Sequence, residues 1–146
     1  MSTEKGNEAT TLADQLHSAA IHLLRKLRRE DAASGLNAPR LSALSVVVFA
    51  GPVTLGDLAA AEQVRPPTMT RIVDALAEQH LVVKKKNAQD GRSTLILATA
   101  AGKKLLMQGR ERRVRALAAQ IAALGSDDLA ALGTAAVILR KVIAAI

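Results

Sequence analysis

Residues Thr54 to Gly102 read TLGDLAAAEQVRPPTMTRIVDALAEQHLVVKKKNAQDGRSTLILATAAG and contain the most informative pattern of the chain. Thr54, with Asp57 three residues later, is typical of a helix start, because both side chains can accept hydrogen bonds from first-turn N–H groups. Residues 62–64 are expected to form a turn. Pro66-Pro67 then opens a second helix, at a position where the missing proline N–H costs little. The pattern predicts two short helices joined by a turn.

The second helix has two distinct faces. Its apolar residues form a stripe that is expected to point inward: Ile72, Val73, Leu76 and Leu81. Its polar residues are expected to face outward: Thr68, Thr70, Arg71 and Asp74. Two short helices, of which the second has a polar outer face, match the helix-turn-helix motif, whose second helix enters the major groove of DNA.

A β-hairpin is predicted directly after this helix. The first strand candidate is Val82–Lys86 and the second is Ser93–Leu97, and Asp90-Gly91 between them is a strong turn signal. The hairpin carries Lys84, Lys85, Lys86 and Arg92 in its exposed parts. A basic hairpin attached to a helix-turn-helix is a wing.

The segment VRPPTMTRIVDALAEQHLVVKKKNAQDGRSTLILATAAG resembles the core of the MarR family of winged-helix transcription regulators. The matching residues are Thr70-Arg71, Leu76, Leu81-Val82, Asp90 with Arg92, Thr99 and Gly102. The chain departs from the family pattern at Arg65, where a small capping residue is usual, at His80, where glycine is usual, and at Ala98, where leucine is usual. The resemblance implies a mainly α fold with a small β-hairpin wing and dimerisation helices at both ends.

Three regions are expected in one compact chain. Residues 1–35 form an N-terminal arm and a dimerisation helix, residues 36–100 form the winged helix-turn-helix lobe, and residues 101–146 form C-terminal dimerisation helices. Residues 1–10 are expected to be a frayed arm, followed by a helix over 11–33 that ends at Gly35. A helix over 41–50, apolar nearly all round, is expected to be buried.

The C-terminal region is predicted to contain a long helix from Thr99 to about Leu124 and a last helix with Ser126 as its N-cap. The last helix carries apolar residues at alternating spacings of three and four, a seam suited to another helix: Leu129, Leu132, Ala136, Leu139 and Ile143. The apolar surface of both ends exceeds what one slim protomer can cover, which favours a homodimer. The alternative is that these stripes pack within the monomer.

The charge of the chain is concentrated around the predicted motif. The whole chain has 20 Lys and Arg against 13 Asp and Glu, a net charge of +7. Residues 65–115 alone reach +8, from 12 basic residues (Arg65, Arg71, Lys84, Lys85, Lys86, Arg92, Lys103, Lys104, Arg110, Arg112, Arg113 and Arg115) and 4 acidic ones (Asp74, Glu78, Asp90 and Glu111). A basic region at a groove-reading motif indicates nucleic-acid binding, although a charge run alone is as compatible with a solvated surface.

The candidate residues for contact with double-stranded DNA are Arg65, Pro67, Thr68, Thr70, Arg71, Lys84, Lys85, Lys86, Asp90 and Arg92. The start of the second helix is expected to offer N–H groups to a phosphate and short hydroxyls to base edges. Arg92 suits a narrow minor groove, the three lysines suit phosphates, and Asp90 is expected to orient Arg92. The alternatives are that Thr68 bonds within its own first turn and that Arg71 pairs with Asp74 or Glu78.

Other classes of protein find little support. The chain has no cysteine, which excludes disulfides and thiolate metal sites, and no phosphate loop or nucleophile elbow. His17 and His22 are five residues apart, about 140° around a helix, so they do not share a face as metal ligands would. No cofactor, metal or catalytic site is expected. No apolar stretch approaches the ~20 residues that cross a bilayer, and no signal peptide is present, so a cytoplasmic protein is expected.

The resemblance implies a repressor that is released when a small, often aromatic, anion enters between the DNA-binding lobe and the dimerisation helices. The chain has no Tyr or Trp to line such a pocket, and His17, His22 and Arg40 are the polar candidates. The lack of cysteine argues against a peroxide sensor. Two alternatives remain open: an architectural DNA-binding protein with weak sequence preference, and a small helical enzyme or protein-interaction module.

Overall fold

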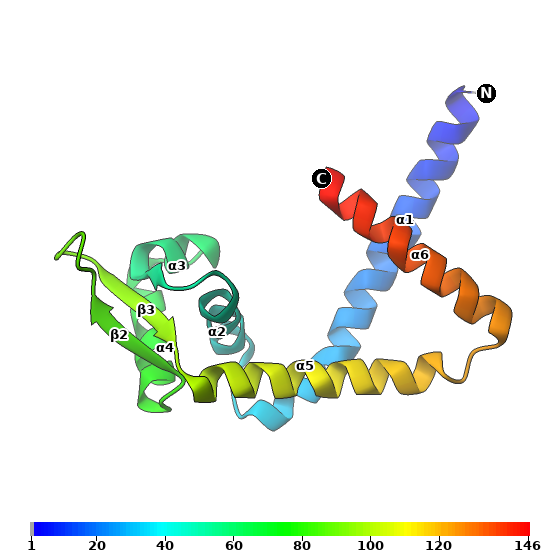
Figure 1. Cartoon of the computed structure of the whole chain (residues 1–146). Coiled ribbons are helices and arrows are strands. Elements are labelled where there is room, and N and C mark those ends of the chain that lie inside the picture. Colours follow the sequence, from blue (N-terminus) through cyan, green and yellow to red (C-terminus); the bar gives the residue numbers. More distant parts are fainter. Residues whose placement is uncertain (1) are drawn as a thin grey trace.

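The computed structural model describes residues 2–146, which form six α-helices, a 3-10 helix and a three-stranded antiparallel sheet of order β1-β3-β2 (Figure 1). In chain order the elements are α1 (Ser2–Leu27), η1 (Arg28–Ser34), α2 (Ala38–Ala50), β1 (Val53–Thr54), α3 (Leu55–Ala61), α4 (Pro66–Glu78), β2 (Val82–Lys86), β3 (Thr94–Ala98), α5 (Ala100–Ile121) and α6 (Ser126–Ala145). A mainly α fold with a hairpin wing is therefore confirmed.

The core lies in the lobe formed by α2, α3, α4 and the sheet. Its largest fully buried side chains come from each of these elements: Leu44, Leu58, Met69, Val73, Leu76, Val82 and Ile96. Each buried aliphatic side chain contributes roughly 1.5–3 kcal/mol. Met69 was assigned to neither predicted face of α4. It is buried with Val73 and Leu76, because positions 69, 73 and 76 lie on one side of a helix.

Local signals place the helix-turn-helix as predicted. The Thr54 hydroxyl accepts from the Asp57 N–H at 3.1 Å and caps α3. The turn after α3 contains Gln63 with φ 54°, and α4 begins at Pro66. His80, where the family usually has glycine, has φ 58°, a left-handed conformation that glycine adopts at lower cost.

The start of α5 is bound tightly to the lobe. Thr99 caps this helix by accepting from the Gly102 N–H at 3.0 Å, and its hydroxyl lies 2.7 Å from the His80 carbonyl. A Cβ on Gly102 would lie 2.2 Å from the Leu81 carbonyl oxygen, so glycine is required for this close approach. These contacts join the first turn of α5 to the lobe.

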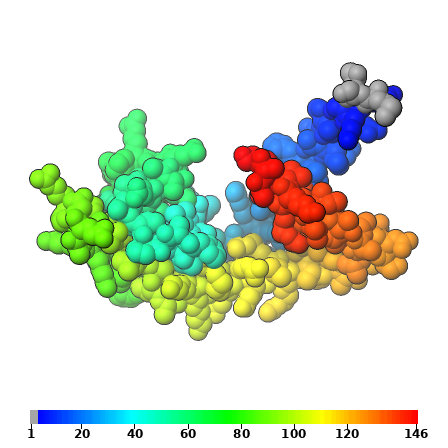
Figure 2. Space-filling model, turned by 45° about the horizontal axis from the view of Figure 1, so that its top comes forward, coloured from blue at the N-terminus to red at the C-terminus, as the bar shows by residue number. Residues whose placement is uncertain are grey.

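The two ends of the chain extend away from the lobe. Figure 1 shows α5 running from the wing side of the lobe to a second region, where α1 and α6 project. In α6 every residue is exposed or half-buried, and α1 is exposed over nearly all of its described side chains. The space-filling view in Figure 2 shows the same separation of the lobe from these arms.

Several boundary predictions at the ends of the chain were wrong. Residues 2–10 belong to α1 instead of a frayed arm, while Met1 lies outside the described residues. The first α-helix ends at Leu27, and the tighter η1 continues to the left-handed Gly35. In the C-terminal region, α5 ends at Ile121, and Gly125 is the N-cap of α6, so Ser126 is its first residue and supplies no cap bond.

The helix α2 is only partly buried, contrary to expectation. It begins at Ala38 with Asn37 as its N-cap, and it buries Ala43, Leu44 and Val47. Phe49, the single aromatic residue of the chain, is 68% exposed. One face of α2 packs in the lobe, and the other is turned toward η1 and solvent.

Candidate nucleic-acid interface

The helix α4 presents a polar face outside the lobe. Thr68, Thr70 and Arg71 are exposed, and Met69, Val73 and Leu76 on the opposite side are buried. The burial of three apolar residues at spacings of four and three fixes the rotation of the helix about its axis. The side chains predicted to read DNA therefore share an open surface.

The N-terminus of α4 differs from the predicted phosphate cradle. Pro66 and Pro67 have no N–H, and the Thr68 N–H donates to the Arg65 carbonyl at 3.0 Å. Three of the backbone donors that a helix start normally offers are thus absent or engaged. Few backbone N–H groups are therefore offered to a phosphate at this end, and the exposed Arg65 side chain supplies positive charge there.

The two threonines of α4 are not equivalent. The Thr70 hydroxyl donates to the Pro66 carbonyl at 3.0 Å, so on DNA it can only accept a hydrogen bond. The bond within the first turn that was considered for Thr68 is made by Thr70 instead. Thr68 is left as the threonine whose hydroxyl can either donate to or accept from a base edge.

The predicted wing is present next to α4. Strands β2 and β3 pair from Val82 with Ala98 to Lys86 with Thr94, and the wing loop 87–93 joins them. The second strand is one residue later than predicted, since the Ser93 hydroxyl and N–H both donate to the Asp90 carbonyl. A third strand, β1, pairs with β3 and was not predicted, because it contains two residues only.

The wing loop holds Arg92 at its outer end. The Asp90 carboxylate accepts from the Arg92 backbone N–H at 3.1 Å, and Asn87 binds the Ser93 hydroxyl at 3.0 Å. Asp90 thus orients the backbone at Arg92 and leaves the guanidinium exposed. Lys85 and Lys86 are exposed on β2 beside it.

One ion pair joins the wing to α4. The Lys84 ammonium lies 2.6 Å from the Asp74 carboxylate, and both side chains are 46% exposed. This pair replaces the bond between Arg71 and Asp74 that was considered above. It neutralises the acidic residue of α4 nearest to the wing, so the surface formed by α4 and the wing is basic.

The basic residues of α5 are only partly available to a ligand. The Arg112 side chain donates to the Glu30 carbonyl at 3.2 Å, and the Arg113 guanidinium pairs with the Asp31 carboxylate. Both arginines link α5 to η1 across 82 residues of sequence. Part of the positive charge that the sequence assigns to a DNA-binding surface therefore has a structural role.

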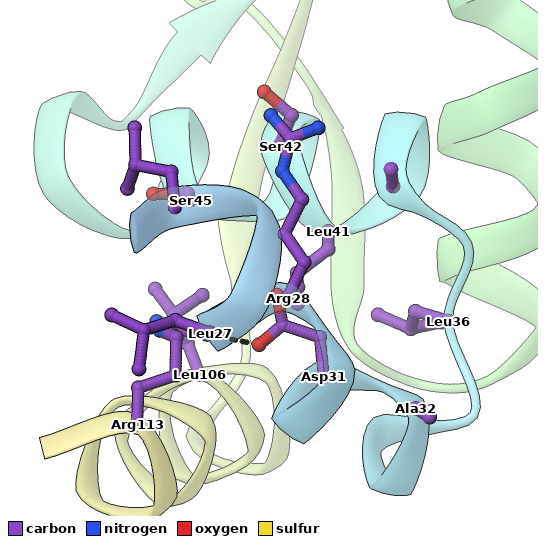
Figure 3. A pocket seen from close by; sticks show the side chains of 12 residues that line it. Leu27, Arg28, Asp31, Ala32, Leu36, Leu41, Ser42, Ser45, Leu106 and Arg113 are labelled. Atoms are coloured by element: carbon purple, nitrogen blue, oxygen red, sulfur yellow. Dashed lines mark hydrogen bonds and ion pairs between the residues drawn. The ribbon is translucent and has the colours of Figure 1, made fainter. Parts of the chain in front are cut away.

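A cavity of about 490 Å³ lies between the lobe and the helices of the two ends. Its walls come from α1, η1, the following loop, α2 and α5, with Leu24, Leu27, Arg28, Asp31, Ala32, Leu36, Ala38, Leu41, Ser42, Ser45, Leu106 and Arg113 as lining residues (Figure 3). His17, His22 and Arg40 do not line it. No spacing in the sequence connects the residues that do line the cavity, because they come from α1, η1, the loop after η1, α2 and α5.

Other sites are not apparent in the described residues. Among residues 2–146 there is no group of three His, Cys, Asp or Glu side chains placed to bind a metal ion. Nor does any single helix in this part of the chain have the length and hydropathy to cross a membrane; the sharply bent combination of 4–34 and 38–50 meets that test by composition and length alone.

A recognition helix, a basic wing beside it and a capped helix-turn-helix define a winged-helix DNA-binding protein. The MarR family model matches residues 36–94. A transcriptional regulator of the helix-turn-helix type from Mycobacterium leprae is 34% identical over 132 residues, which cover 90% of this chain and 92% of that protein. The chain belongs to the MarR family. It is a DNA-binding transcription regulator and not an enzyme.

Solved structures have the same fold. A transcriptional regulator from Thermotoga maritima superimposes with a TM-score of 0.82 at 19% identity, over 92% of this chain and 94% of that one. A variant of S. aureus MepR bound to an oligodeoxyribonucleotide superimposes with a TM-score of 0.70 at 16% identity, over 90% of this chain and 97% of that one.

Proposed function

We propose that two copies of the chain form a homodimer that represses transcription by binding a pseudo-palindromic site, with one α4 helix in the major groove of each half-site. The observation that carries this proposal is the open polar face of α4 beside a basic wing. The half-sites would be about one helical turn, or a small multiple of it, apart.

The exposed area of the chain supports the dimer. The protomer exposes 10748 Å², against about 7,100 Å² for a compact monomer of this mass. Much of the exposed apolar surface is on α1 and α6, where Leu12 is 56%, Leu129 47% and Ile143 68% exposed. Monomers rarely leave such surface uncovered, and large obligate dimers bury areas of this size. A second copy supplies the same apolar helices.

On DNA, the side chains have different roles. Thr68, Thr70 and Arg71 face the base edges in the major groove, while Arg92 enters the adjacent minor groove. Lys85 and Lys86 contact phosphates, which adds affinity and salt dependence without sequence selection. Asp74 pairs with Lys84 at the junction of α4 and the wing, so Lys84 is not available to a phosphate while the pair is intact.

Release from DNA would follow when a small molecule occupies the cavity between the lobe and the two ends. The cavity touches α1 and η1 on the dimer side, α2 in the lobe, and α5, which spans both. A ligand there changes the angle between the lobe and the dimer helices, and so the distance between the two α4 helices. Its volume lies in the range of small-molecule sites.

Footprinting on DNA from the source genome tests the regulator. We expect two discrete protected half-sites with a dyad between them. Uniform protection that spreads with protein concentration would instead identify the architectural DNA-binding protein. A dimer mass in solution and a single operator-sized complex would accompany the expected result.

A further inference from the structure

The walls of the cavity are aliphatic. Leu24, Leu27, Leu36, Leu41 and Leu106 supply most of the apolar lining, and no aromatic residue contributes to it. The single aromatic side chain of the chain, Phe49, lies outside the cavity. A flat aromatic ligand would find no ring to stack on, whereas a flexible hydrocarbon chain gains from contact with leucine side chains in any orientation.

The charged residues of the cavity are unequal in number. Arg28 and Arg113 line it together with one carboxylate, that of Asp31. Arg113 pairs with Asp31, and the side chains of the pair are 28% and 18% exposed. Within the described part of the chain Arg28 enters no ion pair, and its side chain extends toward Ser42 in Figure 3. The cavity therefore has one positive charge in excess.

We propose that the cavity binds a straight-chain aliphatic carboxylate, with its hydrocarbon among the leucines and its carboxylate on Arg28. This assignment rests on the proposed effector cavity, but it concerns binding in the absence of DNA. Ser42 and Ser45 provide hydroxyls at the same wall for the second carboxylate oxygen.

The bound carboxylate also competes with Asp31 for Arg113. In the free protein, the Arg113–Asp31 pair and the bond from Arg112 to Glu30 hold η1 against α5. An anion that takes Arg113 leaves Asp31 without its partner in a partly desolvated place, which is unfavourable. Asp31 then turns to solvent, and η1 loosens from α5. This exchange links ligand binding to the angle between the dimer helices and the lobe.

Calorimetry on the wild-type protein, without DNA, tests the ligand class. Octanoate, decanoate and dodecanoate, below their micelle concentrations, should bind with affinity rising about fourfold per methylene until the cavity is full. Decanoate should bind at least about tenfold more tightly than decanol, decylamine or salicylate. Equal affinity for decanol, no dependence on chain length, or tighter binding of salicylate would each overturn the proposal.

Matched variants test the residues. Arg28→Gln should weaken decanoate binding by about tenfold or more, while Arg29→Gln, in the same 3-10 helix but outside the cavity, should not change it. Asp31→Asn should strengthen decanoate binding by about fivefold, since it removes the competing carboxylate. Unchanged affinity in both Arg28→Gln and Asp31→Asn, with circular dichroism as for the wild type, would reject the site.

A separate measurement distinguishes this proposal from the proposed function. Fluorescence anisotropy with an operator duplex reports DNA binding with and without decanoate. Loss of DNA binding with intact decanoate binding would refute the repressor and leave the ligand site standing. Operator binding that is intact but accompanied by no decanoate binding in calorimetry would refute the ligand site alone.

Discussion

The Lys84 ammonium lies 2.6 Å from the Asp74 carboxylate and joins the wing to the recognition helix. Because both side chains are 46% exposed, solvent screens the pair, and it adds at most about 0.2–1 kcal/mol to folding. The pair matters more for DNA binding, because Lys84 neutralises the Asp74 carboxylate, which lies at the edge of the basic surface and would otherwise repel DNA.

Substitution of either partner should separate these effects. Lys84→Ala is expected to leave an unpaired carboxylate near DNA and to weaken operator binding severalfold, with the salt slope unchanged because Lys84 makes no phosphate contact while it is paired. Asp74→Ala should free Lys84 for phosphate and strengthen binding. Anisotropy titrations at several salt concentrations measure both. Equal effects of the two variants on affinity would show that the pair acts only in folding.

Arg92 is the side chain that we expect to read the minor groove. Arg92→Ala should weaken operator binding by about ten- to a hundredfold and leave the dimer mass unchanged. Lys103→Ala, which removes an exposed charge from the start of α5, is the control for loss of charge alone. Similar losses in the two variants would count against a specific role for the wing tip.

The seam of α6 should hold the dimer together. Leu132→Arg and Ile143→Arg introduce a charge on its apolar side and are expected to give monomers in light scattering, with the helical content of the lobe retained. Thr134→Arg places the same side chain on the opposite side of α6, about 200° from Leu132, and should stay dimeric. A dimeric Leu132→Arg protein would place the interface elsewhere.

The contact between Gly102 and Leu81 predicts a large loss of stability on substitution. A Cβ at Gly102 would lie 2.2 Å from the Leu81 carbonyl oxygen, so Gly102→Ala should lower the free energy of unfolding by roughly 2–3 kcal/mol. Gly56→Ala, whose Cβ would approach nothing closer than 3.9 Å, should be neutral or slightly stabilising. Urea denaturation compares the two. A Gly102→Ala protein as stable as wild type would contradict the close approach.

The backbone at His80 predicts a gain. With φ 58°, His80 occupies the left-handed region at a cost of about 1 kcal/mol, and His80→Gly should raise the melting temperature by a few degrees. The exposed imidazole contributes little packing that the substitution would remove. A lower melting temperature would mean that the side chain stabilises the turn by more than the backbone strain costs.

Local sequence signals determined where several helices and the first strand of the wing begin or end. Thr54 and Thr99 cap their helices, Gly35 ends η1 in the left-handed conformation, and β2 begins and ends as predicted. These features depend on hydrogen bonds between residues close in the chain, so a single sequence contains the information for them. The basic hairpin next to the helix-turn-helix was assigned as a wing from the same local pattern, and the apolar stripes at both ends favoured a dimer, which remains a prediction.

The pairing of side chains from distant segments, in contrast, depends on how the helices and the sheet pack in three dimensions. Met69 is part of the core, Lys84 binds Asp74, and Arg113 binds Asp31 from 82 residues away. The cavity likewise combines residues of α1, η1, α2 and α5, which no spacing in the sequence connects. Contacts between distant segments depend on how the helices pack. Periodicity predicts which face of a helix is apolar, but it does not predict which other element packs on that face or which residue pairs with a charged side chain beside it.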